Sequence, residues 1–325
     1  MLDGAELRKQ RPMRHRLKSL ALVVLLGAAG AVWLSAAQEK RKGRRRRRPA
    51  PRAAPRRAAA VVLSGGLRTF LHCNGSFFDR VVAENPDFRF DYFVHAVLEG
   101  DGGDAAAFQA LKSGAHPNVK RVEAELAADA RRAVLRELPN LAKLPAGNGT
   151  ARGKAINVAS MFRSIALAEA LRAGAAYDVV LRLRPDAYFC SPVNLTAALA
   201  VLDEDVVLVP FAEDQLVFDQ FAVAGPSAMA RYGRAYADTL TREIARNPQR
   251  ALYPEREMWR HFRAEKLKAV TLREFRSTLV RLDGAGAPRH EDAYAKLRLD
   301  YPHLARVAMP APVETCAPRK KRRGG

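Results

Sequence analysis

The chain has 325 residues, 48% of them hydrophobic, which is enough to bury the core of one large domain or two small ones. Its formal net charge of +21 is concentrated at the ends: residues 1–57 carry 17 Lys and Arg against 3 Asp and Glu, and residues 319–323 add five more bases. Since this leaves only +2 for residues 58–318, composition provides no basic face there and argues against a nucleic-acid-binding protein.

Residues 19–38 contain no charged side chain and read SLALVVLLGAAGAVWLSAAQ. As a helix they would be about 30 Å long, the thickness of the hydrocarbon core of a bilayer. We therefore predict one transmembrane anchor here, after a basic tail at residues 1–18. A cleaved signal peptide is the alternative, because Ser35, Ala36 and Ala37 offer small residues at a cleavage position, although the preceding 18 residues are long for one.

Two patterns disagree about which side of the membrane the rest of the chain faces. Six Lys and Arg precede the anchor and eleven follow it in residues 40–57, so the positive-inside rule places the C-terminal part in the cytosol. Three of the eight Asn, however, stand in glycosylation sequons: Asn74, Asn148 and Asn194. On the sequons we expect a single-pass type II protein of the Golgi or endoplasmic reticulum membrane, with its C-terminal part in the lumen.

Residues 39–57 are rich in Arg, Pro and Ala and predict a disordered basic stem, and residues 319–325 predict a second basic tail. The three cysteines, Cys73, Cys190 and Cys316, show neither a CxxC motif nor metal-ligand spacing. One disulfide would fit a lumenal compartment, and the sequence leaves its pairing open.

From residue 58 onward, short apolar runs alternate with helical patterns. Strands are predicted at 58–66, 91–98, 118–124, 178–183, 205–210 and 220–225. Helices are predicted at 126–138, 155–173, 227–240 and 253–266, the third with Ser227 as its N-cap. Strands separated by helices predict a single α/β domain over 58–318, with a mostly parallel sheet and helices on both faces.

Charged residues and glycines stand where two of these strands end. They are Gly65, Gly66, Arg68, Arg182, Arg184 and Asp186. Ligands of open α/β sheets bind outside the carboxyl ends of the strands, so we expect these residues to converge on one site. The glycines allow close backbone approach, the arginines complement a diphosphate, and Asp186 suits a divalent metal or a sugar hydroxyl. The alternative is an edge strand whose Arg and Asp side chains only form ion pairs.

Four motifs follow one another in residues 58–270. They are Gly-Leu-Arg-Thr at 66–69, Tyr-Asp-x-Val-x-Arg-x-Arg-Pro-Asp at 177–186, Asp-Gln-Phe-Ala at 219–222, and Pro-Glu at 254–255. In this order they resemble a little-characterised algal and bacterial group of GT-A-fold glycosyltransferases, related to transferases of lipopolysaccharide synthesis. The resemblance implies a Rossmann-like GT-A fold, a nucleotide-sugar donor and a glycan or glycoconjugate acceptor. It also adds Gln220 to the donor-binding residues.

The resemblance also bears on cofactors. GT-A enzymes commonly hold a divalent metal with an Asp-x-Asp pair, and this chain has Arg184-Pro185-Asp186 where that pair would fall. Asp186 is therefore the candidate ligand for Mn²⁺ or Mg²⁺. Because one carboxylate of the pair is replaced by Arg184, the arginines would supply part of the metal's charge, and metal dependence stays open.

An inverting transfer needs a base for the acceptor hydroxyl. Asp219 and Glu255 are the candidate catalytic residues, and Asp214 is a third. The predicted function is a membrane-anchored glycosyltransferase. One alternative is a lumenal sugar-binding module of the same fold without catalysis, suggested by the missing carboxylate. The other is a nucleic-acid-binding protein with basic arms, although these arms lack interleaved aromatic residues.

Overall fold

The computed structural model describes residues 56–100, 102–114, 118–145, 151–213, 215–272, 277–282 and 288–291. The predicted anchor, the C-terminal tail and all but two residues of the predicted stem lie outside these ranges, as do Asn148 and Asp214. Within the described ranges, no helix combines the length and the hydrophobicity that a membrane crossing requires. The predicted domain boundaries therefore stay predictions.

The described residues form a central seven-stranded sheet with the order β10-β6-β9-β4-β1-β2-β3. Its strands are β1 (Arg57–Gly66), β2 (Phe88–Leu98), β3 (Val119–Leu126), β4 (Val179–Leu183), β6 (Val206–Val209), β9 (Phe221–Ala224) and β10 (Lys268–Thr271). β9 runs antiparallel to both of its neighbours, and all other neighbouring strands are parallel. The prediction of a mostly parallel sheet is confirmed; the reversed direction of β9 was not predicted.

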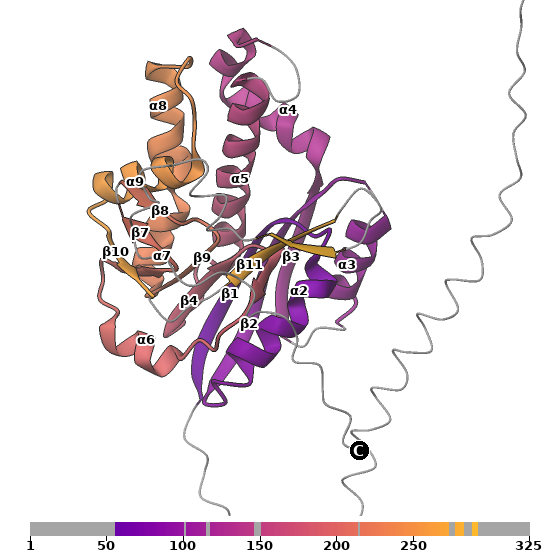
Figure 1. Ribbon diagram of the computed structural model, residues 1–325, viewed down its shortest axis with the longest axis vertical. Helices are drawn as coiled ribbons and strands as arrows, with labels where there is room; N and C mark the ends of the chain where they lie inside the picture. Colours follow the sequence, from indigo (N-terminus) through magenta and orange to yellow (C-terminus); the bar gives the residue numbers. More distant parts are fainter. Residues whose placement is uncertain are drawn as a thin grey trace, which may run out of the picture. The chain divides into compact units, whose positions relative to one another are not determined.

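Helices cover both faces of this sheet, as predicted (Figure 1). One face packs against α2 (Phe70–Phe77), α3 (Gly102–Lys112) and α6 (Leu195–Val201). The other packs against α4 (Ala127–Glu137), α5 (Ala151–Arg172), α7 (Pro226–Gly233), α8 (Thr241–Arg246) and α9 (Pro254–Ala264). Because side chains alternate along a strand, Val61 of β1 faces the first group of helices and Val62 faces the second. A strand covered on both faces needs a continuous apolar run, and β1 has one.

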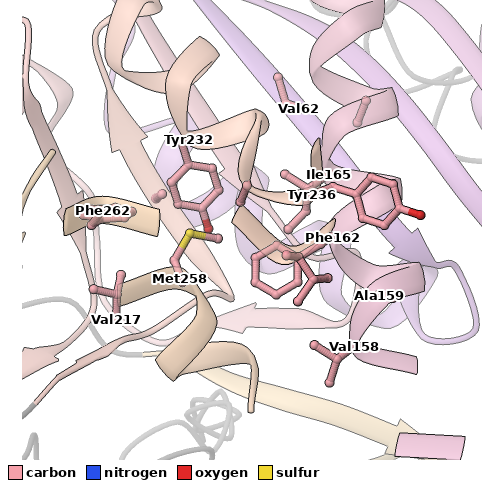
Figure 2. Close-up of a cluster of buried hydrophobic side chains, with 14 of the residues drawn as sticks. Val62, Val158, Ala159, Phe162, Ile165, Val217, Tyr232, Tyr236, Met258 and Phe262 are labelled. Carbon is pink, nitrogen blue, oxygen red and sulfur yellow. The ribbon is translucent and has the colours of Figure 1, made fainter. Parts of the chain in front are cut away.

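The core on the α5 face fixes the position of that helix (Figure 2). Phe162 and Ile165 lie at helical spacing and are buried against the sheet. Tyr232 of α7 and Phe262 of α9 pack edge to face beside them, with ring centroids 5.9 Å apart. The polar side chains on the other side of α5 are therefore held in place by its buried face.

The helix predicted at 227–240 differs from the observed one. α7 begins at Pro226, whose fixed φ and missing N–H suit the first helical position, and Gly225 occupies the N-cap without a side-chain hydrogen bond. The assignment of Ser227 as the N-cap was therefore wrong. The chain continues after Gly233 as a separate π-helical turn, η3 (Ala235–Leu240), and then as α8.

Several short elements were not predicted from the sequence, among them α2, α3, α6 and β10. Others are η1 (Phe78–Val82), η2 (Pro139–Lys143), β5 (Ala187–Phe189), β7 (Ala212–Glu213), β8 (Leu216–Val217), β11 (Ser277–Leu282) and β12 (Pro288–Glu291). β11 pairs with β5 and β12 in a small antiparallel sheet. The backbone of Val280 in β11 bonds to the carbonyl of Asp186 (2.9 Å) and accepts from the hydroxyl of Thr69 (3.0 Å). β11 is thereby attached to the carboxyl ends of β1 and β4.

Candidate ligand-binding site

A cavity of about 710 Å³ lies at the carboxyl ends of β1, β2 and β4. Its wall also includes residues of α4, α5 and β11 and the first residue of α9. A cavity of this size suits a small-molecule ligand, and the carboxyl edge of a parallel sheet is where such ligands bind in α/β folds. Of the predicted site residues, Gly65, Gly66, Arg68, Arg184 and Asp186 lie on this wall.

The two glycines end β1 at the edge of the cavity. Gly65 has φ 123°, in the region that residues with a Cβ rarely adopt. A Cβ there would lie 3.7 Å from Cδ of Pro185, an ordinary contact, so the backbone conformation and not lack of space requires glycine. The turn at Gly65 directs the following residues, including Arg68, along the cavity wall.

Asp186 holds two arginines on this wall. The guanidinium of Arg184 donates two hydrogen bonds to its carboxylate, Nε to Oδ1 and Nη2 to Oδ2, both at 2.9 Å. Arg281 of β11 donates to Oδ2 as well. Burial alone would raise the pKa of Asp186, but the two guanidiniums outweigh it and hold the pKa below its ordinary value. A tight turn, with the N–H of Ala187 bonded to the carbonyl of Arg184, brings the first pair together.

The residues around Asp186 do not fit a divalent metal site. Both oxygens of Asp186 already accept hydrogen bonds from guanidiniums, whose positive charge repels a cation. In the described part of the chain, no three His, Cys, Asp or Glu side chains come together as metal ligands. The assignment of Asp186 as a metal ligand therefore stays a prediction that this geometry does not support, since its carboxylate organises two arginines.

Arg182 does not line the cavity, contrary to the prediction that it contacts the donor diphosphate. It is 1% exposed and shares the face of β4 with Val180, beneath the helices of the α5 side. Its Nη2 donates to the hydroxyl of Ser64 (3.3 Å), and Ser64 lies on the cavity wall. Nε and Nη1 have no hydrogen-bond partner among the described residues. The end of β4 explains this, since Arg182 lies inside the strand, under the helices that cover it, whereas Arg184 follows the last strand residue, Leu183.

The candidate catalytic residues lie at different depths. Asp219 is 2% exposed and is not part of the cavity wall; one of its oxygens has no hydrogen-bond partner in the described residues. Glu255 is half-buried in the first turn of α9, next to Pro254, which lines the cavity. Burial would lower the pKa of Arg184, but Asp186 and, more weakly, Asp219 and Glu255 raise it. The charges of both candidates thus act on Arg184. Glu255 directly follows a residue of the cavity wall, Pro254, whereas Asp219 does not adjoin a wall residue in the chain.

Gln220 is also buried below the wall. Its backbone carbonyl accepts the N–H of Arg184 (3.1 Å), whereas its side-chain Oε1 has no partner within the described ranges. It therefore supports the position of Arg184 through the backbone, and its side chain does not line the cavity.

Sequence reasoning missed several residues of the wall: Glu99, Arg131, Asn157, Ser160, Ser164 and Arg281. No local pattern marks Arg281, because β11 reaches the site only through tertiary pairing. For α5 a signal was present, since Asn157, Ser160 and Ser164 are spaced three and four apart and so lie on one side of the helix, in a stretch whose one charged residue is Arg163.

A buried imidazole lies behind the cavity. His95 of β2 is 4% exposed; its Nδ1 lies 2.9 Å from Oγ of Ser164, and its Nε2 lies 3.5 Å from Oε1 of Glu125. Arg163 donates to both oxygens of Glu125, at 2.7 and 2.9 Å. Burial, together with the charge of Arg163, lowers the pKa of His95 to about 4, so the ring is neutral at pH 7.

The predicted sequons occupy different environments. Asn194 is exposed at the N-cap of α6, where its Oδ1 accepts the N–H of Ala197 (2.9 Å). Asn74 is half-buried within α2. Of the cysteines, Cys73 is buried and free, and Cys190 is disulfide-bonded.

The chain shows only limited similarity to known proteins. No protein-family model and no curated protein matches the chain. Among solved structures, the chain is similar to mouse xyloside xylosyltransferase 1 in its apo form, with 11% sequence identity and a TM-score of 0.38, covering 66% of this chain and 84% of that one. This degree of similarity is too low to assign an activity, and the expected relation to the algal and bacterial group stays a prediction.

Proposed function

We propose that this chain is a glycosyltransferase that binds the diphosphate of a nucleotide sugar in the cavity at the end of β1 and β4. The observation that carries the proposal is the charge of the cavity wall. Four arginines, Arg68, Arg131, Arg184 and Arg281, face two carboxylates, Glu99 and Asp186. The excess of positive charge complements a nucleotide-sugar diphosphate, which carries about two negative charges at neutral pH.

The arrangement of the arginines and glycines on the wall suits a phosphate ligand. Asp186 accepts hydrogen bonds from Nε and Nη2 of Arg184, which fixes the plane of that guanidinium on the wall, and it also holds Arg281 beside it. Gly65 and Gly66 bring backbone next to the same space without a side chain. Guanidiniums and bare backbone together are a common way to hold a diphosphate.

These residues suggest how transfer would proceed. The acceptor hydroxyl attacks the anomeric carbon, the bond from that carbon to the phosphate oxygen breaks, and its electron pair leaves with the nucleoside diphosphate. Arg184 and Arg281 would stabilise the charge that develops on the leaving diphosphate. If the reaction inverts the anomeric centre, a base must take the acceptor proton, and Glu255 is the better placed candidate because it adjoins the cavity wall. Asp219 lies deeper and would act through Arg182 and Arg184.

We further propose that the enzyme works in the lumen of the Golgi or endoplasmic reticulum, held by residues 19–38. The uncharged run and the sequons support this, and the exposed position of Asn194 is compatible with a glycan. The acceptor would then be a glycan or glycoconjugate passing through that compartment.

A second candidate function is a sugar-binding module without turnover. It is favoured by one observation: Asp186, at the position of the Asp-x-Asp pair that GT-A transferases commonly use, is bonded to two arginines and does not form a metal site with other described residues. Such a module would bind the nucleotide sugar without releasing nucleoside diphosphate.

The test uses the full-length protein, purified in detergent and incubated with a panel of uridine and guanosine diphosphate sugars, with Mn²⁺ or with EDTA. Release of nucleoside diphosphate is measured. We expect release from at least one donor, reduced at least tenfold in Arg184→Ala, whereas Arg132→Ala, an exposed arginine of α4 outside the cavity wall, should match the wild type. Binding without release would favour the sugar-binding module, and no binding of any donor would refute the proposal.

A further inference from the structure

One side of α5 presents uncharged polar groups to the cavity. Asn157, Ser160 and Ser164 all lie on its wall, together with the apolar Val158 and Met161. We call Asn157, Ser160 and Ser164 the α5 polar stripe. The arginines of the wall come from other elements, namely the loop after β1, α4, the turn after β4, and β11. The cavity therefore has a cationic set of groups and a separate neutral set.

Asn157 of this stripe is exposed, but the two serines do not form an ordinary solvated helix surface. Ser164 is 1% exposed, and Oγ of Ser160 is buried although it has no hydrogen-bond partner among the described residues. Buried hydroxyls are nearly always hydrogen-bonded, and leaving one without a partner costs about 1–3 kcal/mol. An unpaired hydroxyl on a cavity wall is accounted for by a partner that enters the cavity.

His95 determines which hydrogen-bonding role Ser164 can play. The carboxylate of Glu125 has no proton to donate, so the imidazole nitrogen that faces it, Nε2, is the one that carries hydrogen. The ring is neutral, and Nδ1 then accepts the hydroxyl hydrogen of Ser164 across 2.9 Å, a shorter contact than the 3.5 Å from this hydroxyl to the carbonyl of His95. The lone pairs of Ser164 are left over, so this oxygen can only accept a hydrogen bond from a ligand.

We propose that the α5 polar stripe binds the uncharged, hydroxyl-bearing ring of the ligand whose phosphates the arginines bind. This inference rests on the proposed function and deepens it, because it assigns the neutral part of the substrate to named residues. Ser164 accepts from a ring hydroxyl, Ser160 donates to or accepts from another, and the amide of Asn157 does both. Ribose and a hexose share this chemistry, and the experiment separates them.

Binding of three kinds of probe to the full-length protein is measured by titration calorimetry. The probes are inorganic diphosphate, the nucleoside diphosphates UDP and GDP, and UDP-glucose and GDP-mannose. The variants are Ser160→Ala, Asn157→Ala and Ser164→Ala. The Ser160 hydroxyl has no hydrogen-bond partner among the described residues, so Ser160→Ala removes no hydrogen bond there. Ser113→Ala, on α3's C-terminal turn away from the cavity, is the matched control.

We expect inorganic diphosphate to bind the α5 variants as it binds the wild type. Nucleotide or nucleotide-sugar affinity should fall about three- to tenfold per variant, the effect of one neutral hydrogen bond. Equal loss with nucleoside diphosphates and their sugar conjugates assigns the stripe to ribose; loss confined to the conjugates assigns it to the transferred sugar.

Unchanged affinity for every probe in all three variants overturns the inference while leaving the anion site intact. The same holds if inorganic diphosphate is weakened as much as the nucleotides, since the stripe would then only support the arginines. If the wild type binds none of the probes, the proposed function fails, and this inference fails with it. Ser160→Ala and Asn157→Ala keep the result interpretable should Ser164→Ala, which deprives His95 of its partner, not fold.

Discussion

Arg281 donates a hydrogen bond to Asp186, 95 residues earlier in the chain, and so completes a site that begins with the Arg184–Asp186 pair. The contact links β11 to the turn after β4 and places a second guanidinium on the cavity wall. One buried carboxylate thereby sets the positions of two cations that come from distant segments.

Replacing Asp186 with Asn should release this arrangement. An amide cannot compensate two guanidiniums, so we expect the free energy of unfolding to fall by about 2–4 kcal/mol in urea denaturation at pH 7. The matched control is Asp238→Asn, which breaks a more exposed i,i+4 pair with Arg234 and should cost less than about 1 kcal/mol. Since the native pKa of Asp186 is lowered, its contribution to stability is present at neutral pH and is lost as the pH falls through that pKa. Equal losses in the two variants would argue against the role of Asp186 as organiser.

Lysine at position 184 or 281 should weaken anion binding although it retains the charge. An ammonium group cannot make the two-pronged bond of Arg184 to Asp186, and at either position it cannot present a planar edge to a phosphate. We expect about a tenfold loss of affinity for inorganic diphosphate, measured by calorimetry. Arg182→Lys should instead change mainly the stability, because Arg182 is buried away from the wall. If Arg182→Lys weakens binding more than Arg184→Lys at equal stability, the assignment of the wall is wrong.

The stability of the protein should fall as the pH drops from about 6.5 toward 4. In this window the unfolded chain takes up a proton at His95, whereas the native state, with the pKa of His95 lowered to about 4, does not. The unfolded state binds more protons, so the free energy of unfolding decreases with falling pH, by at most about 1.4 kcal/mol per pH unit for this group. His261, also buried with a lowered pKa, adds to the slope.

The slope is measured by urea denaturation between pH 5 and 6.5, and His95→Asn should make it shallower. The amide oxygen of Asn can still accept the Ser164 hydroxyl hydrogen, but the side chain does not titrate. Between pH 7.5 and 8.5, where the histidine is neutral in both states, the two proteins should show the same slope. An unaltered slope at low pH would show that His95 is not the neutral group described above.

Gly233→Ala should destabilise the packing of α7 on α5. A Cβ at this position would lie 2.7 Å from Cγ and 2.9 Å from Cβ of Glu169, closer than real contacts allow. We expect a loss of about 1–3 kcal/mol on denaturation. Gly75→Ala, where a Cβ meets nothing within 4 Å in a helix, should be neutral or stabilise by about 0.5–1 kcal/mol. A neutral Gly233→Ala would mean that the two helices can separate without cost.

If the domain faces the lumen, Asn194 should carry a glycan. Treatment of the expressed protein with an N-glycosidase should increase its electrophoretic mobility, and Thr196→Ala should remove one glycan while keeping the Asn194 cap of α6. Thr196→Ser, which preserves the sequon, is the control. Absence of any shift, together with protease access from the cytosolic side, would place the domain in the cytosol, as the flanking charges suggest.

Local patterns in the sequence were sufficient for much of this fold. The apolar run of β1, the helical spacing of Phe162 and Ile165, and the glycine turn at Gly65 all depend on neighbouring residues, and the structure has these elements close to their predicted places. The turn after β4, with its Arg184–Asp186 pair, is equally local. The sequence by itself therefore determined the α/β class and the strand ends at which a cavity forms.

Tertiary structure alone decided which side chains share that cavity. Whether Arg182 lies on the wall or beneath α7 depends on where β4 ends and on which helices cover it, and Arg281 reaches Asp186 only because β11 pairs with β5. The antiparallel insertion of β9 between β4 and β6 is of the same kind. The pairing of distant strands depends on the free energy of the whole packed core. The sequence neighbours of a residue contribute only a small part of that free energy.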